Sequence, residues 1–110
     1  MIDSLNTITA CIKEYEQSDL IHLERLNNLL KVLTSNLYYL ESQRADYHAK
    51  FQSIIHTLTK EGKSVSRAEN EAHTRVPEMY LLRRTLDAAY RCADAIRTNI
   101  SYMKNEKRNS

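Results

Sequence analysis

The side chains that could perform catalysis or hold a metal ion are scattered along this chain. Four histidines occur, at His22, His48, His56 and His73. None stands in an H-E-x-x-H or Cys/His spacing, and no glycine-rich phosphate loop or nucleophile elbow can be built from the residues. The nearest ligand pairs are Asp19 with His22 and Glu69 with His73, and such pairs on helices are usually solvated or ion-paired. We therefore expect no metal, no cofactor and no enzymatic activity.

The cysteines and the amino-terminal segment indicate in which cellular compartment the protein is expected. Cys11 and Cys92 lie far apart and match no metal or redox spacing, so we expect two reduced thiols. Residues 1–10 lack the basic and apolar regions of a secretory signal. No stretch approaches the roughly 20 apolar residues that a membrane-spanning helix needs. These features predict a cytoplasmic protein that makes no contact with a membrane.

Charge is distributed unevenly between the two halves of the chain. The formal net charge is +2. Residues 60–110 contain eleven Lys and Arg against seven Asp and Glu, whereas residues 1–59 contain five against seven. This asymmetry permits contact with an anionic partner, although many solvated helix surfaces have the same composition. The charge pattern alone leaves both interpretations open.

The elements that carry these side chains are predicted to be helices. One glycine, one proline and no tryptophan leave little material for turns between strands, so the fold class is all-α. From Leu23 to Leu58, ten of eleven a and d positions of a heptad repeat are apolar or aromatic, and Arg44 is the exception. A 3.5-residue repeat keeps its stripe on one side of a helix, which indicates packing against other helices.

The boundaries of the first two helices follow from this repeat. The same heptad frame continues towards the N-terminus, but there acidic residues occupy the core positions. This predicts a break near residues 17–19. We therefore expect a short helix over residues 1–17 and a long helix over residues 19–60, with Ser18 or Asp19 as the N-cap of the long helix.

The end of the long helix is predicted from the only glycine. Gly62 stands in a basic turn, where a residue in the left-handed conformation would end the helix. Ser66 and Glu69 then form a capping box, which predicts the start of the next helix.

A second heptad in a new frame occupies residues 65–104. Eleven of its twelve core positions are apolar, and Arg75 is the exception, interpreted as a polar residue that sets the register. Pro77 lies inside this run, which predicts a kink or a fresh helix start near residues 74–76. The polar tail, residues 105–110, is expected to be frayed.

Together these segments predict a single helical domain over residues 1–110, a short N-terminal helix plus a long antiparallel helical hairpin. The last helix has a wider apolar and small-residue face than one hairpin needs, and either the first helix or other subunits could cover it. We favour a coiled-coil or helical-bundle homo-oligomer. The residues expected at the oligomer interface are Leu30, Leu33, Leu37, Leu40, Leu82, Leu86, Ala89 and Ile96.

Two segments resemble the UvsY family of phage recombination mediators. The first is Arg44-Ala45-Asp46-Tyr47-His48. The second is Ala93-Asp94-Ala95-Ile96-Arg97 followed by Ile100-Ser101-Tyr102-Met103-Lys104. The order of the predicted helices and the basic turn is similar too, so the resemblance covers roughly residues 40–105. It implies a ring-like helical oligomer that binds single-stranded DNA and helps load a recombinase onto strands coated with single-strand-binding protein, in the host cytoplasm if phage-encoded.

The resemblance also implies a DNA-binding position. Basic residues just ahead of the Asp-Tyr-aromatic segment contribute to DNA binding in that family, which corresponds here to Arg44, whereas the family's second basic residue is replaced by Ser42. Further basic residues expected to contact phosphates are Lys50, Lys60, Lys63 and Arg67. Tyr47 and His48 could stack on bases, and Tyr47 could instead pack in the core. The alternative function is a helical protein-interaction module, an adaptor or an inhibitor of a host enzyme, with no nucleic-acid role.

Overall fold

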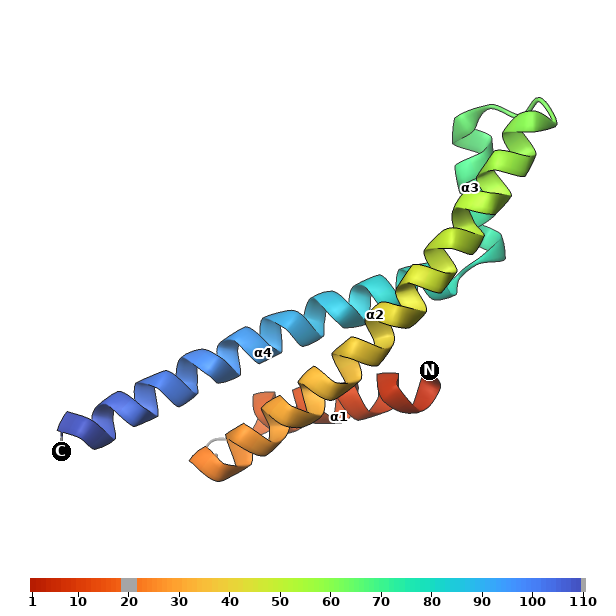
Figure 1. Ribbon diagram of the computed structural model, residues 1–110. Helices are drawn as coiled ribbons and strands as arrows, with labels where there is room; N and C mark the ends of the chain where they lie inside the picture. The colour runs from red at the N-terminus through yellow and green to blue at the C-terminus, as the bar shows by residue number, and fades with distance from the viewer. Residues whose placement is uncertain (19–21, 110) are drawn as a thin grey trace.

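The computed structural model describes residues 1–18 and 22–109, and every regular element within these ranges is a helix (Figure 1). The helices are α1 (Ile2–Gln17), α2 (Leu23–Lys60), α3 (Val65–Arg75) and α4 (Glu78–Asn109). The all-α prediction is therefore confirmed. The last helix was expected to end at residue 104 before a frayed tail, and this was wrong, because α4 continues to Asn109.

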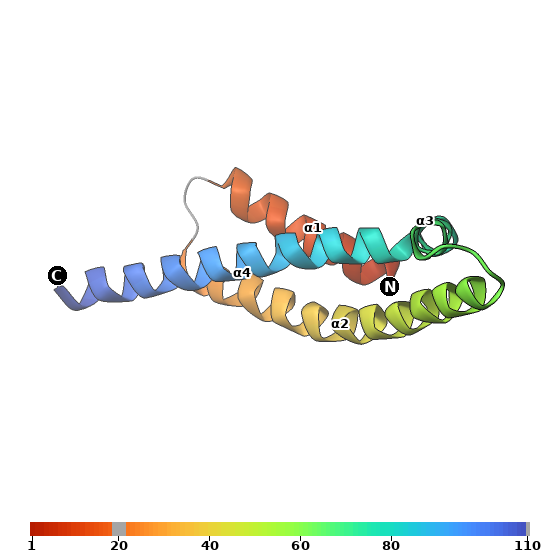
Figure 2. The same cartoon turned by 90° about the horizontal axis from the view of Figure 1, so that it is seen from above.

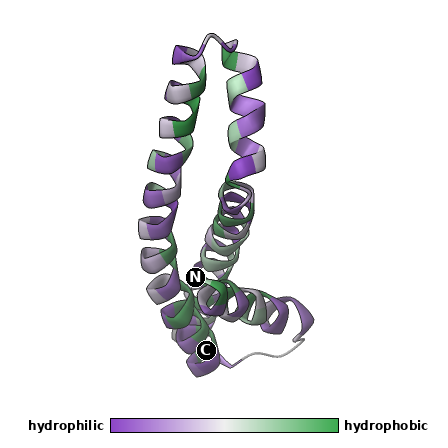
Figure 3. Cartoon of the chain, turned by 90° about the vertical axis from the view of Figure 1, so that its right-hand side faces the viewer, coloured by the Kyte–Doolittle hydropathy of each residue, from purple (hydrophilic) through white to green (hydrophobic). Residues whose placement is uncertain are grey.

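The helices form an elongated body that measures 68 × 25 × 21 Å. α3 and α4 run back along α2 in the opposite direction, α3 beside its C-terminal end and α4 beside the rest (Figure 2). α1 packs against both α2 and α4. Apolar residues gather on the sides by which the helices face one another (Figure 3). The heptad stripes thus meet inside one chain.

The main apolar core joins three helices, and α1 contributes Leu5, Ile8 and Cys11 to it. This arrangement corrects the predicted oligomer interface. Of the eight residues assigned to that interface, Leu30 packs against this core. The other seven are buried in it: Leu33, Leu37, Leu40, Leu82, Leu86, Ala89 and Ile96. The physical reason is that the stripes of α2 and α4 pack on one another and α1 packs against both helices, so these side chains already have partners within the chain.

The junction between α1 and α2 differs from the predicted capping. Ser18 is the C-cap of α1, and its backbone N–H donates to the Glu14 carbonyl. The N-cap of α2 is His22, which makes no side-chain capping bond, so the assignment of Ser18 was wrong. Asp19, the other predicted cap, and the predicted helix start there lie outside the described residues. The two helices are joined instead by a bidentate ion pair in which Arg25 donates to Glu14 at 2.5 Å.

The turn after α2 has the conformation expected for its glycine. Gly62 has φ +96°, and its N–H donates to the Thr59 carbonyl at 3.1 Å. The N–H of Lys63 donates to the Leu58 carbonyl, which completes a Schellman motif. The capping prediction for α3 was wrong by two residues. Ser64 rather than Ser66 is the N-cap, because its hydroxyl accepts from the Arg67 N–H and starts the helix directly after the turn.

The chain breaks at Pro77, where the sequence predicted a kink or a fresh start. α3 ends at Arg75 and α4 begins at Glu78, so the outcome is a fresh start. Val76 leaves the helical region (φ −127°, ψ 68°), as the ring of a following proline favours. Its side chain is buried with Phe51 and Ala72 in a second, smaller apolar cluster. This cluster fixes α3 against the C-terminal part of α2.

Candidate nucleic-acid interface

Arg44 interrupts the apolar stripe of α2, and the structure shows how the guanidinium is accommodated. Its side chain is 45% exposed, and Nη1 lies 3.7 Å from the Glu41 carboxylate one turn earlier. The same carboxylate accepts a hydrogen bond from the Tyr90 hydroxyl of α4 at 2.9 Å. Partial burial, and then this hydrogen bond, raise the pKa of Tyr90. Arg44 therefore stands at the seam between α2 and α4 and is open to solvent.

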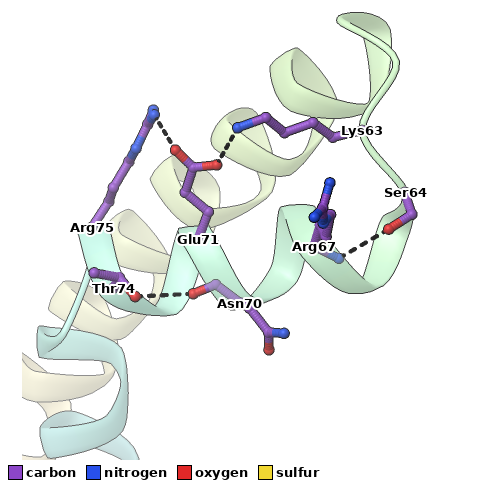
Figure 4. A network of polar contacts seen from close by, with 7 residues as sticks. All are labelled: Lys63, Ser64, Arg67, Asn70, Glu71, Thr74 and Arg75. Carbon is purple, nitrogen blue, oxygen red and sulfur yellow. Dashed lines mark hydrogen bonds and ion pairs between the residues drawn. The ribbon is translucent and has the colours of Figure 1, made fainter.

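A second basic group lies at the tip of the molecule, where α3 begins. Glu71 accepts from Lys63 Nζ at 2.7 Å and from Arg75 at 2.6 Å (Figure 4). The hydrogen bond from Lys63, followed by that from Arg75, lowers the pKa of Glu71. Arg67 forms no ion pair among the described side chains. Glu71 thus pairs with two cations, and residues 60–75 contain four Lys and Arg against three Glu, so the tip keeps a small positive charge.

The structure separates the five predicted DNA-binding residues, although it exposes all of them. Lys63 and Arg67 come together and line a shallow hollow of about 320 Å³ with Glu71. Arg44 lies about 24 Å from Lys60 along α2. Lys50 and Lys60 point away from it, about 120° and 160° around the helix axis. The five residues therefore form no single site.

Tyr47 and His48 are the two aromatic residues predicted to be able to stack on bases. Tyr47 is partly buried and packs against both apolar clusters, which supports the core interpretation. His48 is exposed on α2. A further exposed ring at the Arg44 site is that of Tyr90, which is 43% exposed and binds the same Glu41 carboxylate.

The outer face of α4 carries a basic surface that the sequence analysis did not single out. We call it the α4 hollow, and its lining residues are Tyr80, Arg83, Arg84, Asp87 and Arg91. Spacings of three, four and seven residues place them on one side of the helix. This recurrence was visible in the sequence, but a charged sector of an amphipathic helix usually indicates only solvation.

The described residues offer little for other chemistry. Residues 1–18 and 22–109 contain no group of three His, Cys, Asp or Glu side chains placed to hold a metal ion. Burial raises the pKa of the Cys11 thiol and, likewise, that of the Cys92 thiol, so both are poor nucleophiles. Over the same part of the chain, no helix has the length and apolarity to cross a membrane.

Fold and surface together define an elongated all-helical protein with a closed apolar core and exposed basic groups on α2, α3 and α4. Comparisons with protein-family models, curated proteins and solved structures found no match to this chain.

Proposed function

We propose that this protein binds single-stranded DNA as a homo-oligomer and assists the loading of a recombinase. The observation that carries the proposal is the placement of the basic residues. No charged side chain is buried among the described residues, so none of the nine Lys and Arg of residues 60–106, which outnumber the seven Asp and Glu of that range, lies in the core. Such a surface attracts phosphates and releases their counterions without reading sequence.

Arg44 is suited to exchange its partner for a phosphate. At 3.7 Å its contact with Glu41 is long, and both side chains are more than a third exposed. Exposed ion pairs of this kind contribute about 0–1 kcal/mol, so a phosphate can replace the carboxylate at small cost. The resemblance to the UvsY family points to the same residue. Lys63 and Arg67 provide a second phosphate contact at the tip.

Oligomerisation is proposed through exposed apolar side chains, because the heptad leucines are already covered within the chain. Large exposed apolar residues on one helix, α2, are Val32, Tyr38 and Tyr39. Tyr38, at 84%, is the most exposed of the three. The recombinase, the single-strand-binding protein and the cytoplasmic location belong to the same proposal and rest on the family resemblance. The alternative, a helical protein-interaction module, would need a docking surface other than the apolar stripes, because these pack on one another within the chain.

Replacing Arg44 by glutamine should weaken binding of a labelled oligothymidine about fivefold at about 50 mM salt, because one phosphate contact is lost. The slope of log affinity against log salt should fall by about 0.7. Lys31→Gln is the matched control, since Lys31 is exposed on the same helix and in no ion pair among the described side chains.

The same titration in an electrophoretic mobility assay, with light scattering on the free protein, tests the proposal as a whole. A mobility shift from a species larger than one chain is expected. A strict monomer would remove the oligomer from the proposal, and a protein that shifts no oligonucleotide at about 50 mM salt would remove DNA binding.

A further inference from the structure

The α4 hollow is a shallow, open depression of about 280 Å³ between exposed side chains of one helix. Its residues occupy the side of α4 opposite the buried Leu82 and Leu86. It is therefore open along its whole length to a partner from solution.

Positive charge in the α4 hollow is largely unbalanced. Arg83, Arg84 and Arg91 form no ion pair among the described side chains, whereas Arg25 and Arg75 each bind a carboxylate. Asp87 is the one acidic residue in the lining. Arg91 also borders a neighbouring hollow that contains Glu16 of α1, so Arg83 and Arg84 carry most of the uncompensated positive charge. Guanidinium groups are well suited to bind phosphates because their planar donors match phosphate oxygens.

An aromatic ring stands at one end of this row. Tyr80 is 68% exposed, so most of its ring surface is free. Arg84 follows one helical turn later, which places the two Cβ atoms about 5–6 Å apart. An exposed ring beside a guanidinium is the combination by which proteins hold unpaired strands, since the ring stacks on a base while the cation binds the adjacent phosphate.

We propose that the α4 hollow binds a short stretch of single-stranded DNA, with Tyr80 stacked on one base and the three arginines on successive phosphates. The inference rests on the proposed function and names a contact surface for it. From Tyr80 to Arg91 the row is about 16 Å long, which is enough to contact a short stretch of an unpaired strand. A duplex offers Tyr80 no free base face, and an acidic peptide would gain nothing specific from the ring.

The test compares fluorescence anisotropy titrations of an oligothymidine of about 20 nucleotides at about 50 mM salt. Arg84→Gln combined with Arg91→Gln should weaken binding at least about tenfold and reduce the salt slope by about 1.4, since two phosphate contacts are lost. Tyr80→Leu should weaken binding at least about fivefold and leave the slope unchanged. Because these side chains are exposed, circular dichroism should show all variants folded.

The control is Lys13→Gln combined with Lys31→Gln, which removes the same charge from exposed positions on α1 and α2 and should change affinity less than about twofold. If wild type binds and the double arginine variant matches this control, the inference is overturned and the proposed function stands. If wild type does not bind, both fail. A Tyr80→Leu variant that matches the control overturns the stacking contact. Equal binding of a glutamate-rich peptide, lost in the same variants, would identify an acidic protein segment instead.

Discussion

A Leu86→Asp substitution is expected to abolish the folded state at room temperature. Leu86 is fully buried in the middle of α4, within the core that α1, α2 and α4 share. An aspartate there would be ionised without a partner or would have to be neutralised, and either outcome costs several kcal/mol. The free energy of unfolding of native proteins is only about 5–15 kcal/mol, so a loss of several kcal/mol removes much of it. Circular dichroism at 222 nm and thermal unfolding measure it.

Leu81→Asp provides the control for this substitution. Leu81 lies on the same helix but is 47% exposed, so its replacement by the same residue should change stability by about 0.5 kcal/mol or less. Equal behaviour of the two variants would contradict the assignment of the Leu86 face to the core.

An Ile8→Ala substitution is expected to destabilise the protein by about 3 kcal/mol. Ile8 is fully buried where α1 covers α2 and α4, and truncation of such a residue removes burial and leaves a cavity. The effect tests whether α1 completes the core of its own chain. It should be the same at low and high protein concentration, because the contacts are intramolecular. Urea unfolding followed by circular dichroism provides the measurement.

The control for Ile8 lies six residues earlier on α1. Ile2 is 70% exposed, and Ile2→Ala should cost about 0.5 kcal/mol or less. A loss at Ile8 no greater than the loss at Ile2 would contradict the packing of α1 into the core.

The sequence predicted the fold class because its patterns are local. Two heptad stripes, Gly62 and Pro77 each act through neighbouring residues, and the structure places the turn and the break where they occur. The packing of α1, rather than of another subunit, on α4 was harder to predict. A broad apolar face shows that something packs on it, but α1 and a second subunit would leave the same pattern. The α3 cap was misassigned because Ser64 and Ser66 both satisfy capping preferences, and backbone geometry after Gly62 selects Ser64.

The candidate site was predictable only in part. Arg44 had to reach solvent or a carboxylate, and it does both, with Glu41 as its neighbour. Lys63 and Arg67 come together because a tight turn joins α2 to α3. Lys50 and Lys60 lie on other faces, since proximity in sequence along a helix does not place side chains on one side. The α4 hollow was missed because charge on an outer helix face carries no sign of how many carboxylates balance it.

The salt dependence of oligonucleotide binding by the wild-type protein tests the central claim most directly. Phosphate contacts from Arg44, the tip and the α4 hollow should give a slope of log affinity against log salt of about −2 to −4, for about three to six contacts on a single strand. Mixed-sequence and oligothymidine strands should bind with similar affinity, because no base edge is read. Absence of binding at about 50 mM salt, or binding whose affinity does not change with salt, would contradict the account.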